Sequence, residues 1–388
     1  MGEAWFWSDG EQRKGPVEAQ EIRRMVADGR LAQDAPVWRE GLAASMPAGA
    51  VASLVQPTTG EKARGVLASL GTKLSSVAGV PEIEDVPVGQ VLTGGGAASD
   101  EDAEEIFAVG TARTTPPLSE VPTGWPRPRV WWRVLLGSLA AFFLLRLVSS
   151  EFDNPLALPG LIVTGAFMVP LAVVIFFFEL NTPRDVSAYQ VGRMTLLGGA
   201  LALVVTMLLF ELVPDAGTGE LLPALLTGVV EETAKALALL LVLRRTRWRW
   251  QLSGLLFGAA VGAGFAGFAG FESAGYAMFM GDMNKVIFWR SLLSPGGHVI
   301  WTAMIGAALW QVRGTREFAW DMLRHPVVLR RWTVAVVLHG LWDADILGAR
   351  WWLLQSLILL AIGWYLIFGI LKQALAEVAA AKAVAPAG

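Results

Sequence analysis

Three ionisable residues, Glu231, Glu232 and Lys235, lie within one turn of the otherwise apolar stretch "GVVEETAKALALLLVL". A charged side chain costs about 2.5–3.5 kcal/mol at the centre of a membrane helix, which makes a functional role the default interpretation. Glu231 and Lys235 are four residues apart and can pair on one helix face. Two adjacent carboxylates favour general acid or base chemistry. The alternative is a structural ion pair, which would leave Glu232 without that partner.

More polar residues interrupt later apolar stretches: Glu272 in "FAGFES", His298 in "GGHVIWT", and His339 with Asp343 in "HGLWD". Asp343 follows His339 by four residues, so its carboxylate can accept a hydrogen bond from the imidazole and orient it. Carboxylates and imidazoles can bind a divalent metal such as zinc, or activate a water directly. The spacing leaves both possibilities open.

The composition indicates a polytopic membrane protein. The 388 residues are 54% hydrophobic and 17% charged, and the mean hydropathy is +0.49. The net charge of −3 gives no case for nucleic-acid binding. The absence of cysteine excludes disulfides, thiolate zinc sites and cysteine nucleophiles. The N-terminal "MGEAWFWSDGEQRKG" lacks the apolar segment of a signal peptide.

The predicted fold class is mainly α, a helical membrane bundle of about eight spans preceded by a small α+β domain and a disordered linker. We predict a domain at 1–50, a Gly-, Pro- and acid-rich linker at 51–124, the membrane domain at 125–373 and an Ala-rich tail at 374–388. The predicted spans lie near 131–149, 158–180, 193–213, 220–243, 253–279, 291–312, 328–347 and 351–371. Basic clusters fall in alternate loops, which predicts that both termini are cytoplasmic.

The polar residues of these spans share one depth. At 1.5 Å per residue, most of them lie roughly 10–16 Å below the outer surface, although they come from four different helices. Six glycines of the fifth predicted span have the small-residue spacing that lets helices pack closely. We therefore expect one polar layer in which Glu231, Glu232, Glu272, His298 and His339 lie together.

The motifs "EETAK", "FAGFE", "GGHVIWT" and "HGLWD", in this order over roughly residues 130–372, resemble the PrsW family of intramembrane proteases. That family is a distant relative of the CAAX prenyl endopeptidases and the CPBP proteins. The resemblance implies a bacterial inner-membrane enzyme that cleaves a membrane protein, such as an anti-sigma factor, near the outer face. It implies that Glu231 or Glu232 activates the attacking water, and that Glu272, His298 and His339 complete the site or bind a metal. Lys235, Phe268 and Asp343 would support them.

The N-terminal "WFWSDGEQRKGPVEAQEIRRMVADGRLAQDAPVWREG" is similar to a GYF-like domain of the bacterial GYF_2 type, over about residues 3–50. The resemblance implies that Trp5, Trp7 and Trp38 bind a proline-rich peptide. The chain's own "TTPPLSEVPTGWPRPR" is one conceivable ligand. The alternative is that these aromatic residues only fill the core of the small domain.

Two further functions compete with proteolysis. Intramembrane Glu, His and Asp residues also serve ion- or proton-coupled transporters, but the sequence has no clear inverted repeat of the kind such transporters carry. A non-catalytic membrane receptor or scaffold would use the GYF-like domain to recruit its partner. The transporter predicts flux without cleavage, and the scaffold predicts that the glutamates are dispensable.

Overall fold

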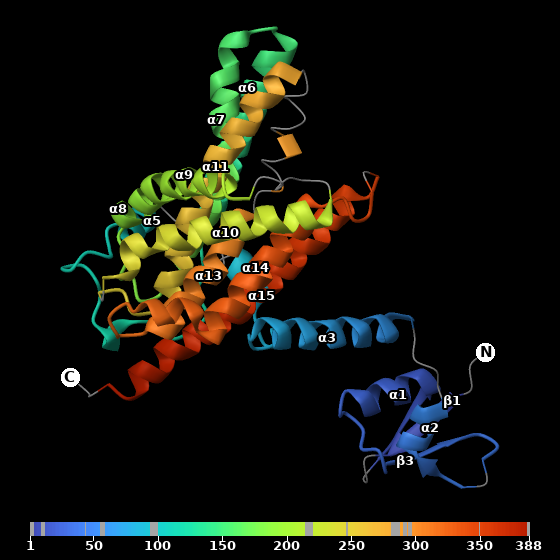
Figure 1. Cartoon of the computed structure of the whole chain (residues 1–388). Coiled ribbons are helices and arrows are strands. Elements are labelled where there is room, and N and C mark those ends of the chain that lie inside the picture. Colours follow the sequence, from blue (N-terminus) through green and yellow to red (C-terminus); the bar gives the residue numbers. More distant parts are fainter. Residues whose placement is uncertain are drawn as a thin grey trace. The chain divides into compact units, whose positions relative to one another are not determined.

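The computed structural model describes residues 4–8, 12–42, 44–54, 59–93, 100–213, 220–245, 247–280, 288–289, 293, 297–348 and 350–385. The chain divides into two compact units, Met1–Gly71 and Thr72–Gly388, which are described separately (Figure 1).

The first unit is a small α+β domain. Its described strands form an antiparallel sheet in the order β2-β1-β3-β4. The core contains Trp5 and Val37 from the sheet and Ile22 and Met25 from one face of α1. The elements are β1 (Ala4–Ser8), β2 (Arg13–Glu18), α1 (Ala19–Ala27), β3 (Pro36–Arg39), β4 (Met46–Pro47), α2 (Ala48–Leu54) and the first part of α3 (Thr59–Ala78).

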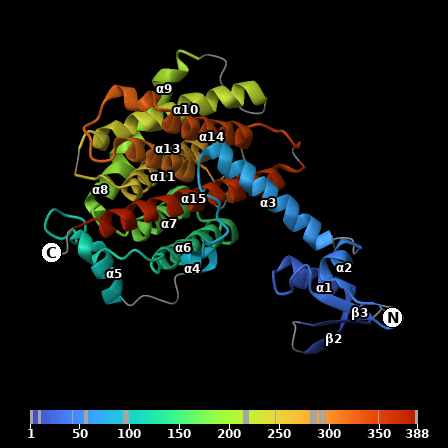
Figure 2. The same cartoon turned by 90° about the horizontal axis from the view of Figure 1, so that it is seen from below.

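The second unit is a bundle of helices (Figures 1 and 2). Its longer helices are α6 (Trp131–Glu151), α7 (Leu158–Leu180), α9 (Gly199–Phe210), α10 (Leu221–Leu243), α11 (Gln251–Met280), α13 (His298–Arg313), α14 (Pro326–Asp343) and α15 (Trp352–Ala383). The short elements are α4 (Val88–Thr93), α5 (Asp100–Phe107), η1 (Leu118–Glu120), η2 (Pro155–Ala157), α8 (Ala188–Arg193), the π-helix η3 (Met194–Gly198) and η5 (Trp320–Arg324).

Helix α11 lies at the centre of this bundle and packs against α7 and α13. Its glycines allow direct contact between backbones, because a β-carbon at Gly258 would overlap the carbonyl of Thr302 and one at Gly262 would overlap the carbonyl of His298. Helix α14 packs in turn against α10 and α13 (Figure 1). These contacts bring α10, α13 and α14 together, which are the helices that carry the conspicuous glutamates and histidines.

Five helices among the described residues are long and apolar enough to cross a membrane: Trp131–Glu151, Pro155–Leu180, Ala188–Phe210, Gln251–Ser273 and Trp352–Ala383. The other three expected spans do not meet these conditions of length and apolar composition. Helix α13 has 16 residues, and part of the expected span 291–312 lies outside the described residues. Helices α10 and α14 each carry three charged residues. The number of eight spans therefore stays a prediction.

The segment expected as a disordered linker is partly ordered in the structure. Within 51–124 the structure describes α3, α4, α5 and η1. Three isolated apolar residues of this segment, Val80, Val91 and Val121, pack against the bundle and are buried in the core of the second unit. The expected Ala-rich tail likewise continues α15 as far as Ala383, with Val378 buried. Low complexity in the sequence concealed these apolar contacts.

Half-buried carboxylates hold the N-terminal ends of two helices. Glu179 accepts hydrogen bonds from the backbone N–H groups of Arg129, Val130 and Trp131 at the start of α6, and Glu377 accepts one from Gln251 at the start of α11. The first N–H groups of a helix lack partners within the helix, and a negative charge there is favourable. These contacts fix the first turns of α6 and of the central helix α11.

Asp185 performs a similar task in the loop between α7 and α8. Its carboxylate accepts hydrogen bonds from Asn181 Nδ2 at 3.0 Å and from Ser253 Oγ at 2.9 Å. Burial raises the pKa of Asp185 above its ordinary value of 3.8, although the hydrogen bonds from Asn181 and Ser253 oppose that rise. Since Ser253 belongs to the first turn of α11, Asp185 ties this loop to the central helix.

Candidate functional site

Helix α10 provides a buried ionic cluster. Lys235 Nζ lies 2.6 Å from Glu232 Oε1 and 3.4 Å from Glu231 Oε2. The side chains of Lys235 and Glu232 are fully buried, whereas that of Glu231 is 16% exposed. The i,i+4 pairing of Glu231 with Lys235 is present as the spacing predicts, and the shorter contact is with Glu232. One carboxylate therefore anchors the ammonium group, and the other reaches toward α13 and α14.

Helix α14 presents His339 between three carboxylates. Its Nδ1 is 2.9 Å from Glu232 Oε1, and its Nε2 is 3.2 Å from Asp343 Oδ2 and 3.6 Å from Glu231 Oε2. The indole of Trp301 stacks on the imidazole with ring centroids 4.6 Å apart. We expected Asp343 to orient this ring. The structure adds Glu232 at the other nitrogen, so a carboxylate from a different helix also fixes the imidazole.

Helix α13 begins with His298, which places this imidazole at a helix end. Its Nδ1 is 2.9 Å from Lys235 Nζ and 3.7 Å from Glu231 Oε2. The ring also packs edge-on against Phe265 of α11 and lies 5.0 Å from the ring of His339. The close approach of α11 and α13 at Gly262 therefore sets the position of His298.

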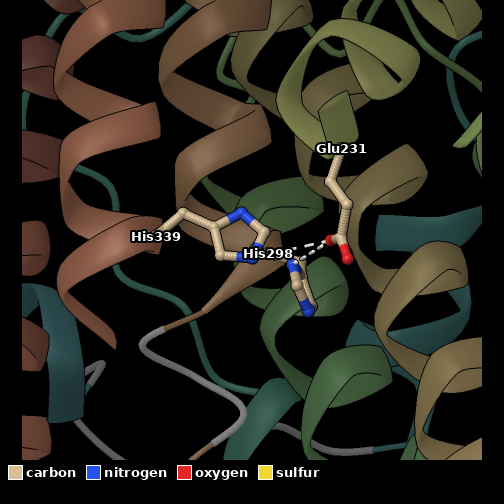
Figure 3. Close-up of side chains that lie close together, drawn as sticks. All are labelled: Glu231, His298 and His339. Carbon is tan, nitrogen blue, oxygen red and sulfur yellow. Dashed lines mark ion pairs between the residues drawn. The ribbon is translucent and has the colours of Figure 1, made fainter. Parts of the chain in front are cut away.

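The three side chains converge, as Figure 3 shows for Glu231, His298 and His339. Among the described residues, each of these three offers one donor atom within 4.8 Å of the others. Two ligand atoms held at about 2.0–2.1 Å from a tetrahedral zinc ion lie about 3.4 Å apart. The separations of 3.6 and 3.7 Å from Glu231 Oε2 to the two imidazoles are close to that value. Two histidines and a glutamate thus fit a divalent metal such as zinc.

Glu272 and Phe268, both on α11, are not part of this cluster. Glu272 is exposed and is not one of the three residues whose donor atoms converge. Phe268 packs edge-on against Phe167 of α7, with ring centroids 5.8 Å apart. The expected layer therefore contains Glu231, Glu232, His298 and His339 together, but the structure does not bring Glu272 to them. The metal-ligand set that the geometry favours has Glu231 in place of Glu272.

Gln355 of α15 holds the turn that follows α14, a task that we did not infer from the sequence. Its Nε2 donates to the carbonyls of Leu341 at 2.6 Å and Ala344 at 2.7 Å, and its Oε1 accepts from Leu347 N at 3.1 Å. Asp343, the last residue of α14, lies in the sequence between the two carbonyls that Gln355 binds. The one available signal was a lone glutamine in the apolar stretch "WWLLQSLILL".

The aromatic residues of the first unit differ in exposure. Trp5 is buried in the core of this unit, whereas Trp7 and Trp38 are partly exposed. Basic side chains lie over their rings: Arg39 over Trp5 at 5.4 Å, Lys14 over Trp7 at 4.9 Å and Arg13 over Trp38 at 5.2 Å. Trp5 therefore fills the core, and Trp7 and Trp38 are the better candidates for contact with a peptide.

Two family models match the chain. Residues 188–371 match the model described as PrsW family intramembrane metalloprotease, and residues 5–54 match GYF domain 2. Both resemblances that the motifs indicated are thereby confirmed. Neither a curated protein nor a solved structure gives a significant match. With its apolar helices and this membrane-protease domain, the chain is a multi-pass membrane protein.

Proposed function

Because residues 188–371 carry a PrsW family domain, we propose that this protein is an intramembrane endopeptidase that hydrolyses a peptide bond in a membrane-protein substrate. The observation that carries this proposal is the convergence of Glu231, His298 and His339 from three helices. A cavity of about 410 Å³ next to them, partly lined by His298 and Asp343, offers room for a substrate segment.

The residues of the site have different roles in the proposed hydrolysis. Glu231 Oε2 lies at similar distances from both imidazoles, so an atom between them can contact all three groups. The water oxygen attacks the carbonyl carbon of the substrate, and a basic group of the site takes the water's proton. The group that took this proton then returns it to the amide nitrogen as the C–N bond breaks. Glu232 and Lys235 hold Glu231 and the two rings in place.

Two forms of water activation are compatible with this donor set. A divalent metal such as zinc, held by Glu231, His298 and His339, would lower the pKa of a bound water and polarise the substrate carbonyl. In the glutamic form, Glu231 itself accepts the proton of the water. Metal analysis of the purified protein by mass spectrometry distinguishes the two. About one zinc per chain, lost in His298→Ala and His339→Ala, supports the first form, and activity that persists without bound metal supports the second.

The proposed setting is a bacterial inner membrane with both termini in the cytoplasm. Basic clusters such as Arg244, Arg245, Arg247 and Arg249 lie on the side that this topology assigns to the cytoplasm. The polar layer then lies nearer the outer face, where the substrate, for example an anti-sigma factor, would be cut. No observation favours transport over proteolysis.

The first unit is proposed to recruit a proline-rich peptide, with Trp7 and Trp38 as the contact residues. The chain's own proline-rich segment has contacts of its own. Val121 in this segment is buried in the core of the second unit, and its carbonyl accepts a hydrogen bond from Lys382 at 2.8 Å. This favours a ligand from another protein over the intramolecular one.

The test of proteolysis compares peptide N-termini in membranes and medium from cells that express wild type or Glu231→Gln at matched levels. We expect new N-termini, near the outer ends of membrane-spanning segments, with the wild type alone. Identical N-termini in the two samples, with the variant folded and inserted, would contradict the proposal. Flux across liposomes without cleavage would favour the transporter instead.

A further inference from the structure

The cavity beside the candidate site has an unusual lining. Its wall includes small residues of α7 and α11, four tryptophans, and polar residues such as Asp343, Asp345 and Gln355. The small residues are Gly165, Ala166, Ala266 and Gly270, and the indoles are those of Trp289, Trp301, Trp342 and Trp352. A lining of this kind leaves space and offers flat apolar surfaces to a guest.

Gly270 differs from the other glycines of α11. In the described stretch from Gly254 to Gly267, a β-carbon would overlap a neighbouring helix: the backbone of α13 at three positions, Thr195 of η3 at a fourth and the ring of Phe167 at the last. These glycines are therefore required for packing. At Gly270 a β-carbon would meet only Ala166, at 3.4 Å, which is an ordinary van der Waals contact. Packing thus does not explain why residue 270 is a glycine.

The position of Gly270 in the cavity wall supplies an explanation. The cavity that His298 and Asp343 line adjoins Glu231, because Glu231 Oε2 lies 3.7 Å from His298 Nδ1, so the cavity offers space for a side chain next to a peptide bond that reaches Glu231. A larger residue at 270 would take up part of that volume. We propose, on the basis of the proposed protease function, that this cavity binds a large apolar side chain flanking the scissile bond, and that Gly270 determines this specificity.

The test uses the full-length protein in detergent and synthetic membrane-spanning peptides that copy an identified cleavage site. One set of peptides varies the residue before the cleaved bond, and a second set varies the residue after it. In each set this residue is Gly, Ala, Leu or Phe. We expect wild type to cleave the Phe and Leu peptides of one set at least about 10-fold faster, in kcat/KM, than the Gly peptide. Gly270→Leu should reduce this ratio about 10-fold or more, and Gly270→Ala should reduce it less.

Two controls separate specificity from misfolding. Gly270→Ala introduces only the ordinary contact with Ala166, so its smaller shift remains measurable if Gly270→Leu does not fold. Gly137→Leu on α6, where a β-carbon meets nothing within 4 Å, should leave the ratio unchanged. Cleavage by wild type with the same ratio in both Gly270 variants would overturn this inference alone. Failure of wild type to cleave any peptide would instead refute the protease proposal.

Discussion

Helices α10 and α11 carry acidic residues at similar predicted membrane depths but present them in opposite ways. On α10, Glu232 is fully buried against Lys235 and His339. On α11, Glu272 is exposed, and the glycines that touch other backbones lie in the buried stretch before it. Gly262 is the residue of α11 that meets His298, and Glu272 follows it by ten residues, which is about 15 Å along a helix. The depth predicted from the ends of separate spans therefore selected candidates and did not by itself show which of them meet.

The largest expected effect is the difference in activity between equivalent amide substitutions on the two helices. Glu231→Gln removes a carboxylate next to both imidazoles and should lower kcat by about 10²–10⁴-fold, the range of general acid–base contributions. Glu272→Gln changes an exposed residue and should stay within about threefold of wild type. Cleavage rates on one purified substrate measure both. A larger loss in Glu272→Gln than in Glu231→Gln would reverse the comparison.

Next in size is the loss of the ammonium group on α10. Lys235→Met leaves Glu232 buried without its cation, and breaking a buried ion pair in this way destabilises a protein by about 3–5 kcal/mol. The double variant Glu232→Gln/Lys235→Met removes both charges and should recover most of this loss. Thermal unfolding in detergent compares these variants with Glu272→Ala. If the two α10 variants are equally unstable, the ion pair is not the source of the effect.

A smaller effect should appear within α11 itself. Gly258→Ala forces a β-carbon against the carbonyl of Thr302 on α13 and should destabilise the bundle by about 1–3 kcal/mol, the usual cost of overpacking. Gly270→Ala should be close to neutral in stability, because its new contact with Ala166 is an ordinary one. Unfolding temperatures of the two variants test this difference. Equal destabilisation would mean that Gly270 also serves packing.

The smallest expected effect concerns the attachment of α11 to Asp185. The raised pKa of Asp185 means that the folded state binds this proton more tightly than the unfolded state. Its contribution to stability is therefore full below pH 3.8, and it is lost as the pH rises through the raised pKa. Asp185→Asn should reduce the change of Tm with pH in this range. Each kcal/mol of unfolding free energy corresponds to about 2–4 °C in Tm. Asp321→Asn, at an exposed residue, serves as the control.

Much of the site followed from short-range spacing. The i,i+4 geometry predicts the pairing of Glu231 with Lys235 and of His339 with Asp343, and both contacts are present. The contacts of Glu232 with His339 and of Lys235 with His298 join residues 107 and 63 positions apart. No helical period predicts such pairs. The ordered parts of the expected linker were missed for a related reason, since single valines carry little periodic signal.

The sequence by itself determined the membrane character, the two family resemblances and the polar groups available for hydrolysis, because composition and local spacing are properties of the chain. The tertiary structure decided which of these groups meet. Backbone contact between α11 and α13 at Gly262 sets the position of His298, and the packing of α14 against α10 brings His339 to Glu231 and Glu232. Glu272 lies beyond the buried part of α11, in a stretch from 268 to 273 that is only half-buried or exposed. Contact between distant residues depends on how helices are turned and packed, which local spacing does not encode.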